Sequence, residues 1–521
     1  MNRHGLTRIA TALALSAMLA GCGGGDRPTA NVHPLTNAAA AAVPGATLPG
    51  IEGRKRALAV TATIDATMLF EWIEKEYPDL FPAGPQNQPL TAGGMSYTLR
   101  YYPPPADNYA GVGSDRNVYG LGAFTNNEIK NFGPLSTFTC TVAPDLCVPA
   151  LRTAIAERFG VANYPVGAAI EPTSITKAPD SSLLTKHFSS ITAENVMKPN
   201  VLWPNAPGSS TAPAAAPNFT QADALASFAA ANNLQLRGHT LLWHQSAPGW
   251  FFAGDTSDPA NYRAAVRQRL RNYIFAVVQH FPDVYAWDVV NEVASDTQNA
   301  SNPYRTNSPW YQAYGVGGND GSEYVRDAFL FATQARASIG RNSANMKLML
   351  NDYSTEQPGK RANVIQILRD VLKAGTGADI NGVGHQFHLQ VGANVAEVSA
   401  AFAAVEGVSG ALVNHVTELD VSIYADPGNC FSALSIPPCL ADYGTVPSPA
   451  VLSQQATLYR ALFDAFHRPS VTSVTLWGIA DNHTWLNSFP VQRTNRPLLF
   501  DTAGQPKWAF WTVVDPKFVV P

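Results

Sequence analysis

Charged residues are scarce in this 521-residue sequence, in which Asp, Glu, Lys and Arg together make up 14%. The formal net charge is −4 and no segment forms a basic stripe, so a nucleic-acid partner is not expected. The sequence also lacks a glycine-rich phosphate loop, a serine nucleophile elbow and a cluster of histidine ligands. We therefore expect neither a metal nor a cofactor, and a neutral, polar substrate fits the composition.

Long hydrophobic runs are absent except at the N-terminus, which has the features of a targeting segment. Arg3 and Arg8 precede an apolar core at Ile9–Ala20, which is too short to span a bilayer. The small residues before Cys22 resemble the bacterial lipoprotein cleavage motif, in which the cysteine is lipidated and becomes the first mature residue. A plain secretory signal with a chance cysteine is the alternative. We predict a signal peptide at residues 1–21 and an exported lipoprotein at the outer membrane or cell surface, otherwise a periplasmic or secreted protein.

Cysteine is rare, with five residues, and those other than Cys22 form two closely spaced pairs. The pairs are Cys140 with Cys147 and Cys430 with Cys439. In an exported chain, each pair is most simply interpreted as a disulfide that closes a proline-containing loop. Metal binding is the alternative, but neither pair has C-x-x-C spacing or nearby histidines. We predict two disulfides.

The composition divides the remaining chain into three regions. Residues 22–61 are rich in Gly, Ala, Pro and Thr, which is typical of a flexible linker. Residues 62–148 predict a small α+β module of unknown function, with a helix from Asp65, a strand at Ser96–Tyr102 and a hairpin at Tyr109–Leu121. We interpret the tyrosines of this module as the core of a small sheet; stacking on sugars is the alternative. Residues 149–521 form the third region.

The third region alternates between strand-like and helix-like segments, which indicates βα units. Its clearest helix, Tyr262–His280, carries one apolar stripe. Eight such units predict a (β/α)8 TIM barrel with long loops. The strands are expected at Val166–Ile170, Ser189–Asn195, Gln235–Trp243, Tyr285–Glu292, Lys347–Tyr353, Gly382–Gln390, His415–Ile423 and Val474–Asp481.

Almost every predicted strand ends in polar or aromatic residues, and a barrel brings these ends together at one mouth. The run Y-A-W-D-V-V-N-E ends in Asn291 and Glu292, and the run H-V-T-E-L-D carries Glu418. Carboxylates among aromatic side chains suit cleavage of a glycosidic bond. That reaction needs one acid to protonate the leaving oxygen and one carboxylate across the anomeric carbon. Indoles stack on sugar faces, while amides and imidazoles bond and orient the hydroxyls.

Residues 149–515 resemble glycoside hydrolase family 10, the endo-β-1,4-xylanases. The resemblance depends on seven stretches in the same order, each at a predicted strand end, and it covers no part of residues 1–148. The stretches are T-A-E-N-V-M-K-P-N (192–200), R-G-H-T-L-L-W-H (237–244), W-D-V-V-N-E (287–292), L-N-D-Y (350–353), G-V-G-H-Q-F-H (382–388), T-E-L-D (417–420) and W-G-I-A-D-N-H-T-W (477–485).

The resemblance implies a retaining endo-1,4-β-xylanase that acts by double displacement on xylan or a related β-1,4-linked polysaccharide. It implies Glu292 as the general acid/base and Glu418 as the nucleophile, about 5–5.5 Å apart, with the pKa of Glu292 raised and Glu418 ionised. Gln386 and His388 match positions that hold the nucleophile, and Asn291 matches an amide that bonds the 2-hydroxyl. The other substrate-binding positions that it implies are Glu194, Asn195, Lys198, His239, Trp243, Trp477 and Trp485.

Two positions depart from the family pattern. Ser246 stands where a substrate-binding Gln is usual, and Leu486 where an Arg is frequent. We interpret Trp203, Trp287 and Trp310 as packing residues. The alternatives to a xylanase are another retaining β-1,4-glycanase on the same barrel, acting on cellulose or mixed-linkage glucan, or a catalytically inactive carbohydrate-binding protein. We expect a monomer, with contact to the membrane only through the lipid anchor.

Overall fold

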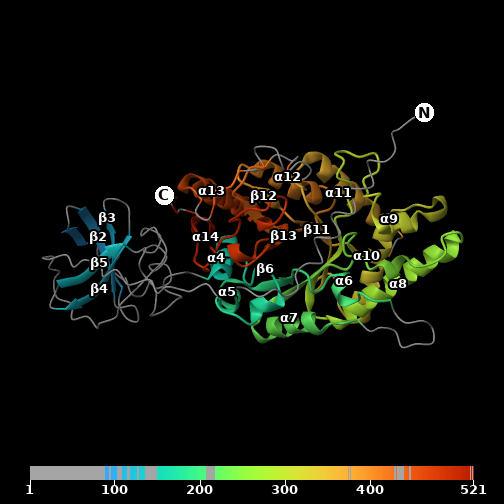
Figure 1. Ribbon diagram of the computed structural model, residues 1–521, viewed down its shortest axis with the longest axis horizontal. Helices are drawn as coiled ribbons and strands as arrows, with labels where there is room; N and C mark the ends of the chain where they lie inside the picture. Colours follow the sequence, from blue (N-terminus) through green and yellow to red (C-terminus); the bar gives the residue numbers. More distant parts are fainter. Residues whose placement is uncertain are drawn as a thin grey trace. The chain divides into compact units, whose positions relative to one another are not determined.

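The structure is a computed structural model, shown in Figure 1. Between residues 88 and 134 it describes the backbone of five strands. It describes side chains for residues 150–206, 217–373, 375, 377–426, 430, 439, 441–444, 447–516, 518 and 520. The predicted signal peptide, the linker, the helix from Asp65, Cys22 and the Cys140/Cys147 pair lie outside the described residues.

The five N-terminal strands form one antiparallel sheet in the order β1-β2-β3-β4-β5. The predicted strand at Ser96–Tyr102 coincides with β2, and the predicted hairpin corresponds to the pairing of β3 with β4, in which Tyr109 lies opposite Leu121. The strands are β1 (Gln88–Ala92), β2 (Met95–Tyr102), β3 (Asn108–Gly113), β4 (Val118–Thr125) and β5 (Glu128–Pro134).

Eight parallel strands of the C-terminal region close into a barrel, which confirms the predicted (β/α)8 architecture (Figure 1). The ring closes because β11 pairs with β13 as well as with β10. A short ninth strand, β12 (His388–Gln390), pairs with the end of β13. The barrel strands are β6 (Val166–Ile170), β7 (Ser190–Ala193), β8 (Gln235–His239), β9 (Val284–Asn291), β10 (Lys347–Asp352), β11 (Gly382–His385), β13 (Val413–Ser422) and β14 (Val471–Leu476).

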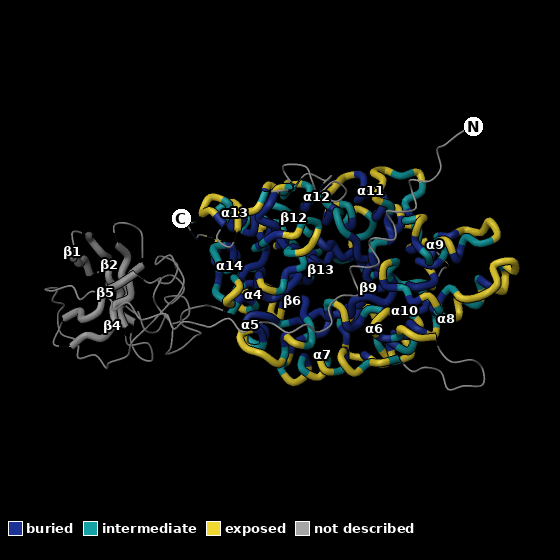
Figure 2. Tube along the Cα trace, in the orientation of Figure 1, coloured by how far each residue is buried: buried dark blue, intermediate teal, exposed yellow. Residues whose placement is uncertain are grey.

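Helices surround the barrel and side chains fill its interior, so its strands are buried almost throughout. In Figure 2, β6, β9 and β13 run through the buried part, whereas α5, α7 and α8 carry exposed residues. The helices are α4 (Leu151–Phe159), α5 (Asp180–His187), α6 (Pro199–Leu202), α7 (Thr220–Ala231), α8 (Pro259–His280), α9 (Pro309–Tyr314), α10 (Glu323–Ser338), α11 (Pro358–Val371), α12 (Val395–Glu406), α13 (Pro449–Phe466) and α14 (Trp508–Val514). None of the helices in the described part of the chain combines the length and the apolar character needed to cross a membrane.

Helix α8 contains the predicted helix Tyr262–His280 and begins slightly earlier. Pro259 stands at its first position, and the side chain of Asp258 accepts a hydrogen bond from the backbone N of Asn261 (3.3 Å). Proline at the first turn and aspartate at the N-cap both favour a helix start, which explains the earlier boundary.

Two predicted strands are divided or shortened. The predicted strand at Gly382–Gln390 is two strands, because Phe387 between them has a φ of 51°, which is outside the extended region. The predicted strand at Gln235–Trp243 ends at His239, and Trp243 makes only an isolated bridge to Asn291.

Three tryptophans contribute to the hydrophobic core of the C-terminal region. Trp287 and Trp310 are fully buried, and Trp203 packs against the core, which confirms the packing interpretation of all three. A Cβ at Gly238 would lie 2.2 Å from the Trp287 ring, so only glycine lets β8 approach this ring on β9.

Candidate active site

The two predicted catalytic glutamates lie directly after β9 and in the C-terminal half of β13. Glu292 follows β9 directly, and its φ of 56° places it in the left-handed region. Its backbone N donates to the carbonyl O of Asn351 on β10 (2.9 Å), which fixes the turn. Glu418 lies within β13 and is buried. Parallel barrels carry their reactive groups at this end of the strands.

A chain of amide hydrogen bonds joins the two carboxylates. Gln386 Nε2 donates to Glu292 Oε1 (3.3 Å) and to Asn291 Oδ1 (3.2 Å). Asn351 Nδ2 donates to the same oxygen of Asn291 (2.9 Å) and to Glu418 Oε1 (2.7 Å). The structure thus brings the two glutamates into one connected site, although they are distant in the sequence. Asn351 was not predicted as a site residue, but it lies in the L-N-D-Y stretch that pointed to this strand end.

A histidine and an aspartate support Glu418 from the side opposite the amides. His388 Nε2 lies 3.1 Å from Glu418 Oε2, and its Nδ1 lies 2.9 Å from Asp420 Oδ2. Burial opposes protonation of His388, but the charge and hydrogen bond of Asp420 raise its pKa to about 10. Burial likewise opposes ionisation of Glu418, yet its contacts with His388 and His239 lower its pKa below the ordinary value. Glu418 is therefore ionised over the neutral range.

Glu292 has different neighbours. Burial raises its pKa to about 7, and the charges of Asp352 and Glu418 add to this rise. Hydrogen bonds from Trp243 Nε1 to Oε2 (2.7 Å) and from Gln386 oppose it. A carboxyl group with this pKa can carry a proton at neutral pH and release it. The predicted separation of the two pKa values is therefore present in the site.

A buried charged cluster lies beneath Glu418. Arg237 donates two hydrogen bonds to Asp288, and His239 Nδ1 lies 2.9 Å from Asp288 Oδ2. His239 Nδ1 is also 4.0 Å from Glu418 Oε1, so Asp288 holds the imidazole at the predicted nucleophile. Burial opposes the charge of Asp288, but Arg237 and His239 outweigh it and lower the pKa of Asp288. Asp288 and Arg237 were missed from the sequence, although both lie in motifs noted there.

The residues expected to bind the sugar on the glycone side form a second cluster. Lys198 Nζ donates to Asn195 Oδ1 (2.8 Å) and lies 4.9 Å from the centre of the Trp243 ring. Asn195 Nδ2 in turn donates to Glu171 Oε1 (2.5 Å). Burial, followed by the charge of Glu171, raises the pKa of Glu194 to about 7. Glu171 was not predicted, and its only signal was a carboxylate directly after a predicted strand.

Ser246 has a structural role in place of the expected substrate contact. Its side chain is buried, and its Oγ accepts a hydrogen bond from the backbone N of Asn200 (3.1 Å) in the first turn of α6. Lys198 is the N-cap residue of that helix. The serine therefore supports the segment that presents Lys198, while Gln245 beside it is exposed.

The two indoles that were predicted to bind substrate, Trp477 and Trp485, lie beside His239 and His388. The ring of Trp477 lies edge-on to His239, with 5.3 Å between the ring centres, and Trp485 lies edge-on to His388 at 4.9 Å. Trp485 Nε1 also donates to Asp420 Oδ2 (2.9 Å), which ties the indole to the support of Glu418.

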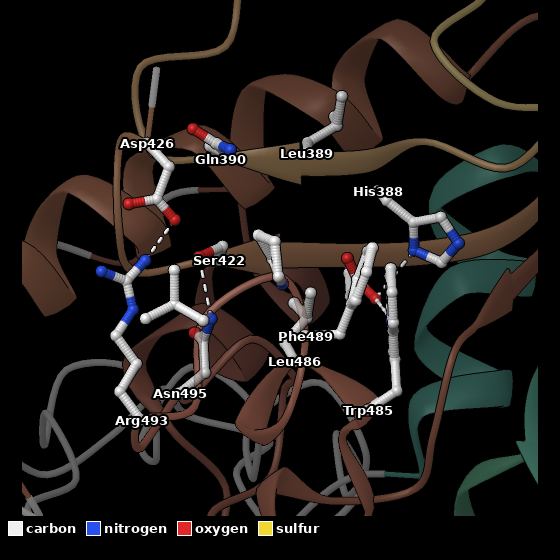
Figure 3. A pocket seen from close by; sticks show the side chains of 13 residues that line it. His388, Leu389, Gln390, Ser422, Asp426, Trp485, Leu486, Phe489, Arg493 and Asn495 are labelled. Carbon is white, nitrogen blue, oxygen red and sulfur yellow. Dashed lines mark hydrogen bonds and ion pairs between the residues drawn. The ribbon is translucent and has the colours of Figure 1, made fainter. Parts of the chain in front are cut away.

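A pocket extends from Trp485 along the segment that follows β14 (Figure 3). Phe489, which is exposed, stacks on Trp485 with 5.4 Å between ring centres, and Figure 3 shows the two rings side by side. The pocket is lined by His388, Leu389, Gln390, Asp420, Ser422, Asp426, Trp485, Leu486, Phe489, Pro490, Val491, Arg493 and Asn495.

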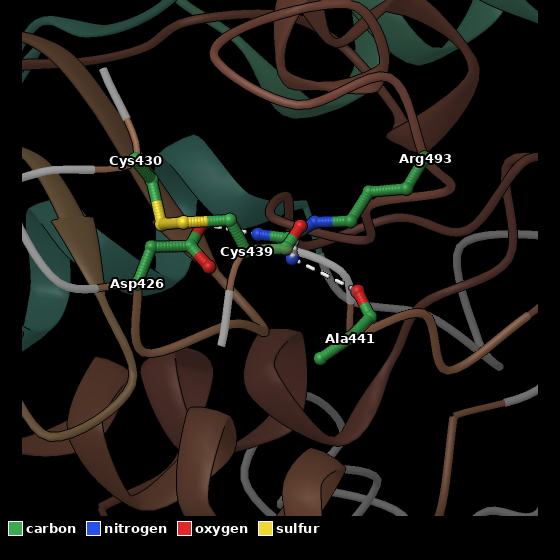
Figure 4. Close-up of a disulfide and its surroundings, with 5 residues drawn as sticks. All are labelled: Asp426, Cys430, Cys439, Ala441 and Arg493. Carbon is green, nitrogen blue, oxygen red and sulfur yellow. Dashed lines mark hydrogen bonds and ion pairs between the residues drawn. A yellow bond between two sulfur atoms is a disulfide. The ribbon is translucent and has the colours of Figure 1, made fainter. Parts of the chain in front are cut away.

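The predicted Cys430–Cys439 disulfide is present, with 5.6 Å between the Cα atoms (Figure 4). Arg493 fastens this loop to the segment after β14. Its guanidinium donates to the carbonyl O of Ala441 (2.9 Å) and pairs with Asp426. The disulfide loop and the segment that carries Trp485 are therefore held together.

No group of three or more His, Cys, Asp or Glu side chains within the described residues is arranged to hold a metal ion.

Residues 151–516 match the sequence profile of Glycosyl hydrolase family 10. The chain belongs to this family. It is therefore a glycoside hydrolase, and the two glutamates that the structure joins are its predicted acid/base and nucleophile.

Several relatives show the same similarity. A protein named "Thermostable celloxylanase" from Thermoclostridium stercorarium is 36% identical over 386 residues, which are 71% of this chain and 88% of that protein. "Endo-1,4-beta-xylanase C" from Paenibacillus barcinonensis is 38% identical over 396 residues, which are 73% of this chain. The chain spans only 33% of the length of that second relative.

Solved structures with the same fold include xylanase B from Clostridium stercorarium F9. It has a TM-score of 0.59 and 37% sequence identity, and the match covers 71% of this chain and 100% of that one. An intracellular xylanase from Thermoanaerobacterium saccharolyticum, solved with xylotriose, has a TM-score of 0.54 and 33% identity. That match covers 70% of this chain and 98% of the other.

Proposed function

We propose that the protein is a retaining endo-1,4-β-xylanase that hydrolyses internal β-1,4-xylosidic bonds of xylan. The observation that carries the proposal is the contrast between two glutamates in one hydrogen-bonded site. Burial and negative neighbours raise the pKa of Glu292 to about 7, while imidazole contacts lower that of Glu418. Glycosidic cleavage with retention needs this pair of a proton donor and an ionised nucleophile.

In the first step, Glu292 gives its proton to the leaving glycosidic oxygen while Glu418 attacks the anomeric carbon. The C–O bond to the leaving sugar breaks, and an ester forms between the glycone and Glu418. Asn351 Nδ2 and His388 Nε2 each contact one oxygen of Glu418, so they orient the carboxylate for attack. Asn291 is held by Gln386 and Asn351.

In the second step, Glu292 acts as a base. The esterified Glu418 no longer carries the negative charge that helps to raise the pKa of Glu292, so this pKa falls. The ionised Glu292 takes a proton from water, the water oxygen attacks the anomeric carbon, and Glu418 leaves as a carboxylate. Two inversions at the same carbon restore the original configuration.

The names of the relatives support xylan as substrate, since most of those cited are called xylanases. The names "Thermostable celloxylanase" and "Exoglucanase XynX" favour a second activity on β-1,4-glucan as the alternative. Product analysis on xylan and on cellulose distinguishes the two. Faster release of glucan oligosaccharides than of xylan oligosaccharides would contradict the xylanase proposal.

Replacing each glutamate by alanine tests the assignment. E292A and E418A should each lower turnover on xylan by several orders of magnitude without unfolding the chain. A variant at Glu397, an ion-paired residue at the start of α12, serves as the matched control. With an activated aryl xylobioside, azide should rescue E292A to give a glycosyl azide of retained configuration, and E418A to give the inverted product. Normal activity of either variant, or exchanged products, would refute the roles.

We also propose that the chain is exported and lipidated at Cys22 and that it acts as a monomer. The apolar core at Ile9–Ala20 and the small residues before the cysteine support the first proposal. The second is supported by the presence of both glutamates and their network on one chain. A C22A variant should move from the membrane fraction to the soluble fraction. An unchanged membrane fraction, or a dimer in sedimentation analysis, would contradict the corresponding proposal.

A further inference from the structure

A buried lysine–aspartate pair lies behind the acid/base glutamate. Lys360 on α11 is 1% exposed, and its Nζ donates to the carbonyl O of Ala294 and to Asp296 Oδ1, both at 2.9 Å. Its third partner is Asp352, the last residue of β10, whose Oδ1 lies 3.1 Å away. Asp352 is fully buried, and its Oδ2 accepts from the backbone N of Ala294 (3.0 Å). A buried lysine stays charged only where such partners replace water.

The pair is joined to Glu292 through the backbone on both sides. The carbonyl O of Asn351, the neighbour of Asp352, accepts from the backbone N of Glu292 (2.9 Å). Arg305 Nε donates to the carbonyl O of Glu292 (2.9 Å), and Arg305 also pairs with Asp296, which Lys360 holds. A glutamate with positive φ needs such support, because residues other than glycine rarely adopt this backbone conformation.

We propose that Asp352 and Lys360 are a positioning pair that sets the pH range in which Glu292 works, with Asp352 supplying negative charge and Lys360 limiting it. The inference rests on the proposed function, because it presumes that Glu292 is the acid/base. Neither residue touches the sugar; both act through Glu292 and its loop.

The charges around Glu292 support this assignment. After burial, Asp352 is the group whose charge adds most to the raised pKa of Glu292, ahead of Glu418. Burial also raises the pKa of Asp352, and Lys360 is the first group that opposes this rise. Lys360 therefore compensates part of the negative charge of Asp352. The other charged or titratable groups near Glu292 or this pair include Glu418 from β13, Lys198 before α6, His244 after β8, Arg305 and Asp296 after β9, Tyr324 of α10 and Tyr353 after β10.

Charge-removing variants give opposite signs. D352N removes the negative charge and leaves Lys360 positive, and both effects favour ionised Glu292. The alkaline limb of the kcat/KM profile should then move to lower pH by about one unit. K360M leaves the charge of Asp352 less compensated, so the limb should move to higher pH. In D352N/K360M the two charges vanish together, and the limb should return close to its wild-type position.

Two controls separate this effect from simple damage to the fold. Lys507 and Asp481 form another buried pair (3.0 Å), so D481N should leave the limb in place. K360R keeps the positive charge, so its alkaline limb should stay at the wild-type pH. It provides the test if K360M does not fold. An aryl xylobioside whose leaving group is a strongly acidic phenol needs little protonation by Glu292. With this substrate, the alkaline limb of the glycosylation step should not shift in any variant.

The outcomes are distinct for the two proposals. If E292A removes the alkaline limb but D352N and K360M lower kcat/KM equally at every pH, the pair is only structural and this inference is wrong. Shifts of the same sign in D352N and K360M would also overturn it. If E292A retains normal activity, the proposed function itself fails, whatever the pair does.

Discussion

Replacing Trp243 by phenylalanine tests the electrostatics of the acid/base directly. Trp243 Nε1 donates a hydrogen bond of 2.7 Å to Glu292 Oε2, and this bond lowers the pKa of Glu292 against the effect of burial. Phenylalanine keeps most of the ring but has no donor. Loss of a donor disfavours the ionised carboxylate, so the pKa should rise above its value of about 7.

The size of the shift follows from the strength of the bond. A hydrogen bond to a charged group contributes about 1.5–3 kcal/mol, and one pKa unit corresponds to about 1.36 kcal/mol. Trp243 is half-buried, so water can replace part of the lost bond, which favours the lower end of this range. The alkaline limb of kcat/KM should therefore move to higher pH by about one unit.

The assay is kcat/KM on a xylobioside whose leaving group needs protonation, measured across the alkaline limb. W243F should have a higher KM, because the indole also contacts Lys198, yet it should keep a larger share of its own maximum at alkaline pH. W477F is the matched control, because it makes the same substitution at an indole that contacts His239 and His388. An alkaline limb that stays in place or moves to lower pH in W243F would refute the reasoning.

Three further variants test other parts of the site. H388Q removes the imidazole that lowers the pKa of Glu418, so the acid limb should move to higher pH and kcat should fall about 10-fold or more; an unchanged acid limb would contradict this. R237M leaves the buried Asp288 without its main partner and should cost about 3–5 kcal/mol of unfolding free energy in a urea titration, whereas a loss below 1 kcal/mol would refute it. The cysteines of the Cys430–Cys439 disulfide are nine residues apart, so its removal should lower the free energy of unfolding by about 2–3 kcal/mol in thermal unfolding. An unchanged Tm would show that the disulfide does not stabilise the protein.

The barrel could be predicted from the sequence because its strands are buried on both faces. Such strands read as continuous apolar runs between loops, and the prediction for Val166–Ile170 matches β6 at both ends. Strand ends were harder to place. His239 ends β8, although the apolar run continues to Trp243, because the chain leaves the sheet while its side chains remain buried. Hydrophobicity reports burial, and burial alone does not distinguish a strand from a packed loop.

The two glutamates and most of their direct contacts could also be predicted, since they lie in motifs at strand ends; Asn351 is the exception. The charged residues behind these contacts could not be predicted. Asp288 and Arg237 are 51 positions apart, and a buried ion pair leaves no periodic signal in the sequence. Lys360 appears there as an ordinary polar residue near the start of a helix, and only the fold shows that it is 1% exposed beside Asp352.

Both reacting groups are glutamates, so the difference between their pKa values comes from the residues around them. It should therefore be possible to narrow the active pH window without touching either glutamate. H388Q should move the acid limb to higher pH through Glu418, and D352N should move the alkaline limb to lower pH through Glu292.

In the H388Q/D352N double variant both limbs should move inward, each by the shift measured in the single variant. The two substitutions alter different partners of different carboxylates, which favours additivity. If instead the whole profile moves in one direction, the two glutamates titrate as one strongly coupled pair. The separate roles of burial around Glu292 and imidazole contacts around Glu418 would then have to be abandoned.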